Sequence, residues 1–195
     1  MALTKLNSNA IPFSTGSVVQ TVFIDDKIGL TLNGSTAMRF MNAQITTKAA
    51  NSTFLVRFSS AVYSRTNDTS QHDANICAAM GYKIGTASTT STDYTAITDY
   101  DPTRERLPFA GSVNRAFYSH DAFGHGNTYQ RFYPITTLYN EDTFAPSQAV
   151  GTVIQVACFV KQDSNGNQYY NVGASISGMA DSGKVSTLTV QEIAA

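Results

Sequence analysis

Apolar and polar residues alternate along much of the chain with the period of two that half-buried β-strands show. In residues 53–63, Phe54, Val56 and Phe58 fall on one face, whereas Arg57 falls on the other. A helix would repeat its apolar positions every three to four residues instead. This segment is therefore predicted to be a strand with one face in a core.

The clearest strand pattern covers residues 152–162. Ile154, Val156, Cys158 and Val160 lie on one side of it. The Asn165-Gly166 pair that follows is typical of a type I′ turn. We therefore expect a hairpin between this strand and the apolar segment 168–176.

Similar segments, separated by turn residues, predict eight or nine strands in all. They are residues 18–24, 38–46, 53–63, 75–84, 113–119, 131–139, 152–162, 168–176 and 185–193. Pro134 restricts the segment 131–139 to a sheet edge or a break, because proline has no N–H for a ladder. The chain has no convincing amphipathic helix. The fold class predicted is all-β, a jelly-roll β-sandwich over residues 17–195.

Residues 1–16 are predicted to be a short N-terminal arm outside the sandwich. They are small and polar, with a few apolar side chains that would each fill a pocket on a partner. The proposed arm anchors are Leu3, Leu6, Ile11 and Phe13. We expect the arm to hold a neighbouring subunit or a shell.

Two long segments, residues 85–112 and 120–130, are predicted to be loops. The first is rich in Ser and Thr and then carries prolines and mixed charge. Loops of this length in a compact domain are usually functional or form interfaces.

Charge is scarce, since Asp, Glu, Lys and Arg make up 14% of the chain against about 25% in soluble domains. The net charge is −1, and no basic stripe is present, so we expect no nucleic-acid partner. No apolar run approaches 18 residues, so we expect no membrane insertion by a helix.

No residue pattern predicts an enzyme, a cofactor or a metal site. His120, Asp121 and His125 have side chains that ligate zinc, but no further ligands follow at a recognised spacing. We interpret them as part of a surface loop. The chain also lacks a GxSxG elbow and a phosphate-binding glycine motif.

Two features leave alternatives open. Cys77 and Cys158 are interpreted as buried thiols of a protein assembled in a reducing cytoplasm, although a disulfide between them remains possible. The aromatic residues between positions 117 and 144 suit either the core or a subunit interface. They are Phe117, Tyr118, Phe123, Tyr129, Phe132, Tyr133, Tyr139 and Phe144.

Three segments resemble small virion surface proteins of cyanophages and other marine phages. They are NSNAIPFSTGSVVQTVF (7–23), ITTKAANSTFLVRFSSAVYS (45–64) and GKVSTLTVQEIAA (183–195). Together they cover about a quarter of the chain, in the family's order. The segment from about 65 to 150 is longer and more aromatic than that family's centre. The partner or receptor that this centre contacts is therefore left unassigned.

The resemblance implies a non-enzymatic protein of the outer surface of a phage particle, with a trimeric jelly-roll head similar to C1q and TNF. A capsid decoration or cement protein is favoured, and the distal receptor-binding knob of a tail fibre is the alternative. Its partners would be two further copies of itself, a major capsid protein or other virion protein, and in the alternative a host surface receptor. In such trimers the C-terminal strand lies near the threefold axis, which here implies Val185, Leu188, Val190 and Ile193.

Overall fold

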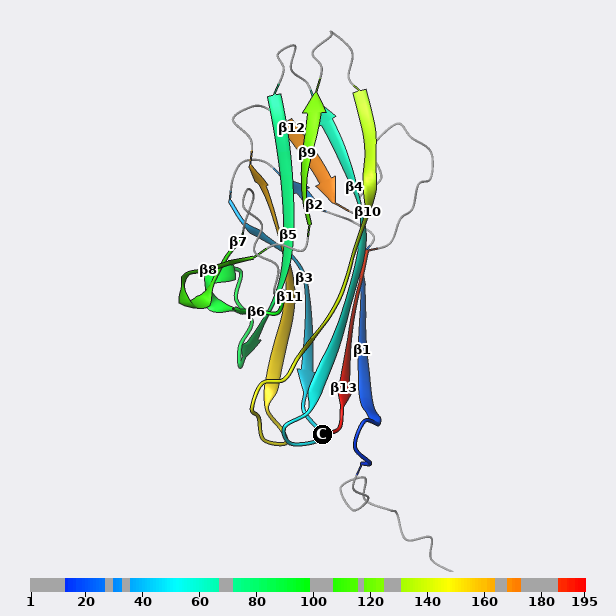
Figure 1. Cartoon of the computed structure of the whole chain (residues 1–195), viewed down its shortest axis with the longest axis vertical. Coiled ribbons are helices and arrows are strands. Elements are labelled where there is room, and N and C mark those ends of the chain that lie inside the picture. The colour runs from blue at the N-terminus through cyan, green and yellow to red at the C-terminus, as the bar shows by residue number, and fades with distance from the viewer. Residues whose placement is uncertain are drawn as a thin grey trace, which may run out of the picture.

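The computed structural model describes residues 13–26, 30–32, 36–66, 72–98, 107–115, 118–124, 131–163, 168–172 and 186–195 (Figure 1). Its strands are β1 (Val18–Asp26), β2 (Leu30–Leu32), β3 (Met38–Thr46), β4 (Thr53–Thr66), β5 (His72–Ile84), β6 (Thr95–Ala96), β7 (Leu107–Phe109), β8 (Val113–Arg115), β9 (Tyr118–Gly124), β10 (Arg131–Phe144), β11 (Val153–Asp163), β12 (Gln168–Val172) and β13 (Ser186–Ile193). Two 3₁₀ turns, η2 (Ser91–Asp93) and η3 (Ala110–Ser112), complete it. The described part contains no α-helix.

Eight of these strands form two antiparallel sheets packed face to face. Sheet A has the order β1-β13-β4-β10, and sheet B has the order β3-β11-β5-β9. The short strands β12 and β2 extend sheet A beside the second half of β4. This order of eight strands is that of a jelly roll, and the predicted fold class is confirmed.

The main core lies between the two sheets and uses the residues that the alternation predicted. Phe54, Val56 and Phe58 of β4 are fully buried in it, and β11 contributes one face of alternating residues. That face consists of Ile154, Val156, Cys158 and Val160, as expected from the sequence. Phe144 closes one side of the core by stacking on Phe54 and on Tyr82.

A second apolar cluster covers the opposite face of sheet B. Phe159 and Ala157 of β11 point away from the main core and pack against Tyr94, Leu107 and Phe109. The last three residues belong to the segment 85–115, the insertion, which folds over the outside of sheet B (Figure 1). Because β11 is covered on both sides, every residue from position 154 to 160 is buried.

The interpretation of residues 85–112 as an open loop is therefore corrected. The described part of the insertion forms η2, β6 and a β7–β8 hairpin, and its aromatic side chains pack in the second apolar cluster. Residues 99–106 lie outside the described residues. The predicted loop 120–130 is also revised, since its first part continues β9 to Gly124.

The predicted hairpin between residues 152–162 and 168–176 is wrong. Strand β12 pairs with β4 and β2 in sheet A, whereas β11 pairs with β3 and β5 in sheet B. The chain crosses from one sheet to the other between these strands. The placement of Pro134 is confirmed, since β10 is an edge strand with an irregular register between Pro134 and Thr136.

Cys77 and Cys158 do not form a disulfide, and both thiols are buried. Cys77 lies in the cluster under the insertion, whereas Cys158 lies in the main core on the other side of sheet B. Burial raises the pKa of the Cys158 thiol far above its usual value. This thiol is therefore unreactive.

Gly81 of β5 allows the insertion to approach sheet B closely. A Cβ at this position would lie 2.6 Å from Phe109 Cε1 and 2.9 Å from Tyr94 Cβ. Both distances are shorter than van der Waals contact, so any other residue would push the two rings away.

The substitution Gly81→Ala should destabilise the protein by about 1–3 kcal/mol, since overpacking costs this much when neighbouring side chains must shift. Urea denaturation measures the loss, and proteolysis within residues 86–115 should become faster. The exposed control Thr86→Ala should change stability by no more than about 0.5 kcal/mol. An unchanged midpoint and unchanged proteolysis for Gly81→Ala would contradict the described packing.

Candidate functional site: an uncovered sheet face

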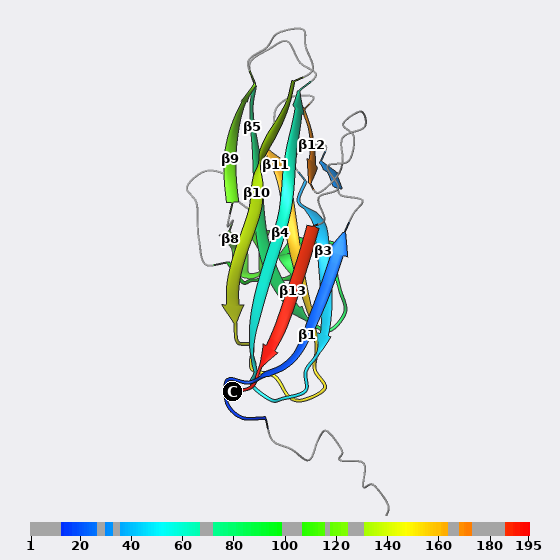
Figure 2. The same cartoon turned by 90° about the vertical axis from the view of Figure 1, so that its right-hand side faces the viewer.

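The outer face of sheet A is not covered by any described segment. Figure 2 looks onto it and shows β10, β4, β13 and β1 side by side. Along each strand, residues of this face alternate with residues of the core. The residues of the face lie in three rows that cross the four strands. From β1 to β10 the rows are Asp25–Thr187–Ser59–Tyr139, Phe23–Thr189–Arg57–Glu141 and Thr21–Gln191–Leu55–Thr143.

Apolar side chains lie at both margins of this face. Phe23 on β1 and Tyr139 on β10 are each 59% exposed. The centre carries threonine hydroxyls on β13 and a single leucine, Leu55. Three of the twelve residues in the rows are charged, so the surface is mainly uncharged, and its exposed aromatic side chains are of the kind enriched at protein contacts.

The charges at the centre of the face neutralise each other. Arg57 Nε donates to Glu141 Oε2 over 2.5 Å, and the Tyr139 hydroxyl donates to the same oxygen over 3.0 Å. The hydrogen bonds that Glu141 accepts, first from Arg57 and then from Tyr139, lower the pKa of its carboxyl group. Donating to Glu141 raises the pKa of Arg57 and also the pKa of Tyr139. Arg57 and Glu141 therefore stay ionised and paired near neutral pH.

The residues proposed for a trimer axis are divided between the core and the surface. Leu188 and Val190 are fully buried inside the sandwich, so the side chains of β13 that point outwards are their neighbours; that this strand lies near a trimer axis stays a prediction. Ile193 is partly exposed, and Val185 lies outside the described residues. The outward residues of β13 are Thr187, Thr189, Gln191 and Ile193.

One end of the sandwich, here called the terminal end, consists of residues 13–18, 46–53, 144–153 and 193–195 (Figure 1). The buried Glu192 side chain holds it together. Its carboxylate accepts hydrogen bonds from the backbone N–H groups of Lys48 and Ala49, from Ser52 Oγ and from Gln20 Nε2. A buried carboxylate is tolerated when donors surround it in this way.

The predicted arm meets the domain at this end. Gly16 N donates to the Ala194 carbonyl, and Thr15 Oγ1 donates to the Ala195 carbonyl. These two residues are therefore bound to the last residues of the chain. Of the proposed arm anchors, Phe13 is 40% exposed, and Leu3, Leu6 and Ile11 lie outside the described residues.

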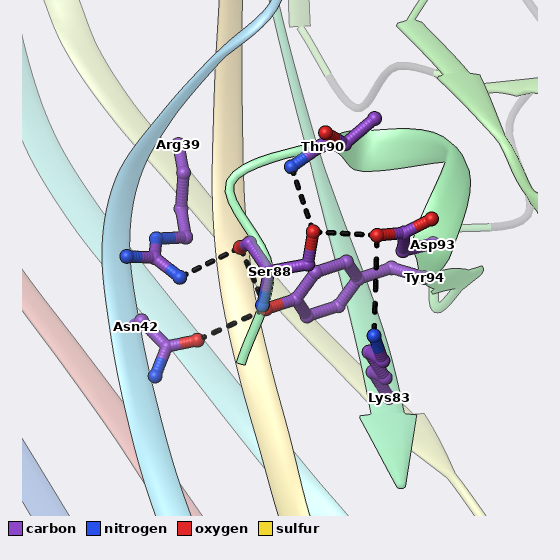
Figure 3. A network of polar contacts seen from close by, with 7 residues as sticks. All are labelled: Arg39, Asn42, Lys83, Ser88, Thr90, Asp93 and Tyr94. Carbon is purple, nitrogen blue, oxygen red and sulfur yellow. Dashed lines mark hydrogen bonds and ion pairs between the residues drawn. The ribbon is translucent and has the colours of Figure 1, made fainter. Parts of the chain in front are cut away.

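A polar network fastens the insertion to sheet B (Figure 3). Arg39 of β3 donates to the Ser88 carbonyl, and the Tyr94 hydroxyl donates to the same carbonyl and to Asn42 Oδ1. Ser88 Oγ donates to Asp93. These hydrogen bonds connect the insertion to β3, so the network fastens it to sheet B.

No cluster of three or more metal-ligating side chains occurs among the residues that the structure describes. His120 lies on β9, and His125 lies outside the described residues; the metal question for this pair stays a prediction. No helix of the described chain is long and apolar enough to cross a membrane. Of the aromatic series, Phe144 belongs to the core and Tyr139 to the open face.

No protein-family model matches the chain, and no curated protein matches it. Among solved structures, the chain is similar to a chain in the structure of the infectious bursal disease virus Gx strain, with a TM-score of 0.37 and 12% identity. It is also similar to a chain in the crystal structure of the VP2 subviral particle of infectious bursal disease virus, with a TM-score of 0.36 and 11% identity. Each likeness covers 100% of this chain and 43% or 42% of the other. The chain thus spans less than half the length of these proteins.

Replacing Glu192 should destabilise the terminal end more than any exposed substitution. The variant Glu192→Ala removes the acceptor of the buried Ser52 hydroxyl and of the part-buried Lys48 and Ala49 N–H groups, which should cost about 3 kcal/mol in the free energy of unfolding. Glu192→Gln keeps an acceptor and should lose less. The neighbouring Gln191→Ala, on the outer face, should lose no more than about 0.5 kcal/mol. Equal losses for Glu192→Ala and Gln191→Ala in chemical denaturation would disprove this role.

Proposed function

We propose that this chain is a non-enzymatic structural protein of a phage particle, a capsid decoration protein that forms homotrimers on the outer surface of the head. The observation that carries the proposal is the asymmetry of the sandwich. Among the described residues, sheet B has apolar clusters on both faces, whereas the outer face of sheet A is open and the ion pair at its centre is complete.

The composition of the open face supports burial in an assembly. Its central ion pair is complete within one chain, so a partner need not supply a counter-charge. Removing unpaired ions from water would cost several kcal/mol each. Closed cyclic symmetry is the usual state of homo-oligomers, and a threefold arrangement satisfies it.

The jelly roll and the sequence resemblance support the virion assignment, because this fold builds many viral surface proteins. The alternative is the distal knob of a tail fibre, which would bind a host receptor. Labelling the protein on intact particles separates the two, since a decoration protein lies over the head and a knob lies at a fibre tip.

The substitution Phe23→Lys should dissociate the trimer, because it places an unpaired charge on the open face. Sedimentation of the wild type should give a mass near three times 21.0 kDa, and the variant should sediment as a single chain. The matched control is Ile84→Lys on β5, where the isoleucine is 51% exposed, and this variant should remain a trimer. A wild type that is a monomer at all concentrations would end the trimer proposal. If the Phe23→Lys variant remains a trimer, the interface between copies does not include the outer face of sheet A around Phe23.

A further inference from the structure

Two exposed aromatic side chains lie at opposite margins of the open face of sheet A. Phe23 is on the edge strand β1 and Tyr139 is on the edge strand β10, and each is 59% exposed. β13 and β4 lie between these strands (Figure 2). Neighbouring strands are about 4.8 Å apart, so three spacings place the two margins about 14 Å from each other. The two rings therefore do not meet within one chain, and each leaves more than half of its surface for a partner.

The positions of these rings suit a closed ring of copies. In a cyclic trimer every contact is heterologous, which means that each copy uses one patch for one neighbour and a different patch for the other. A face with one exposed aromatic residue at each margin supplies two such patches. Aromatic residues are also enriched where protein surfaces meet. The partner that this arrangement favours is therefore a second copy of the chain.

The hydrogen bond of Tyr139 aims its side chain towards the height of Phe23. The hydroxyl donates to Glu141 Oε2 over 3.0 Å, two residues further along β10. Glu141 lies in the same row as Phe23, and Arg57 of that row donates to the same oxygen. The Tyr139 side chain thus leans from its own row into the row of Phe23. Around a threefold axis that runs along the strands, the rows of neighbouring copies stay level, so Phe23 of one copy and the Tyr139 ring of the next lie at the same height.

Charge supports this register. Asp25 lies in the row of Tyr139, one row away from Glu141. The Glu141 carboxylate is already paired with Arg57 in its own chain. A shift along the strands that brought Asp25 level with Glu141 of the next copy would oppose two carboxylates, which disfavours that register.

We propose that the copies of the homotrimer meet through a heterologous contact, in which Phe23 on β1 of one copy packs against Tyr139 on β10 of the next copy, around a threefold axis that runs along the strands. This inference rests on the proposed function and adds the residues that meet between copies. The Arg57–Glu141 pair then acts inside each chain as the support of the Tyr139 side chain.

The contact leaves no polar atom of the two rings without a partner. Phenylalanine has none in its side chain, and the Tyr139 hydroxyl keeps its hydrogen bond to Glu141. Because this bond holds the Tyr139 side chain before the copies meet, little side-chain freedom is lost on assembly. Tyrosines at the centre of such contacts are often the residues whose truncation weakens binding most.

The first test replaces Phe23 with the photo-cross-linker p-benzoylphenylalanine, which keeps an aromatic ring at this position. Illumination of the full-length protein should give linked chains up to a mass near three times 21.0 kDa and none larger. Mass spectrometry should place the link on β10 of another copy, at or next to Tyr139. The matched control carries the same probe in place of Ile84, which is 51% exposed on β5, and it should not link to β10.

The second test measures the association of ring variants by sedimentation. Phe23→Ala and Tyr139→Ala should each raise the concentration at which half of the trimer dissociates by about tenfold or more. Tyr139→Phe keeps the ring and should raise it less. Ile84→Ala removes apolar surface from sheet B and should leave it within about twofold of the wild type. Circular dichroism checks that each variant is folded.

The outcomes separate the inference from the proposed function. A wild type that stays a monomer at every concentration, or that sediments near twice 21.0 kDa, overturns the trimer and the inference together. A wild-type trimer in which the probe at position 23 links to position 23 of another copy, or to no other chain, overturns the inference alone. A trimer that Phe23→Ala and Tyr139→Ala leave unchanged also overturns the inference alone.

Discussion

The packing of the insertion on sheet B is the contact on which the rest of the architecture depends. Tyr94 and Phe109 meet the ring of Phe159 edge-on, at centroid distances of 5.1 and 6.0 Å. Gly81 leaves room for this approach. Sheet B thereby becomes a central layer with apolar clusters on both faces, and the molecule has three layers. Within the described part of the chain, the open sheet face is then the outer face of sheet A (Figure 2).

The two ends of the chain are combined in that open sheet. β1 pairs with β13, and β13 lies between β1 and β4, so the sheet is complete only when the first and last strands are both in place. Glu192, near the end of β13, ties this strand to the loop after β3. The open face and the terminal end therefore share one strand.

Much of the fold could be predicted because alternation is a local property. β3 was predicted at its observed bounds, and the inward residues of β4 and β11 were predicted correctly. The insertion could not be predicted, since its Ser/Thr-rich sequence resembles a loop and its burial depends on rings distant in sequence. Phe159 was for the same reason not recognised as a second-core residue. The hairpin after β11 was predicted from its turn residues alone, whereas pairing with β4 decides the position of β12.

The candidate site was predicted less well for related reasons. The sequence analysis chose the apolar residues of β13 for a contact with other copies. Leu188 and Val190 are buried in the chain's own core, so the polar residues between them form the outer surface of this strand. Glu192 has no sequence signature, because its donors come from a loop about 140 residues earlier.

The most direct test of the account is an electron cryomicroscopy reconstruction of the particle at a resolution that separates strands. It should show sheet A facing neighbouring copies and the insertion facing solvent. A reconstruction with sheet A in solvent and the insertion between subunits would contradict it.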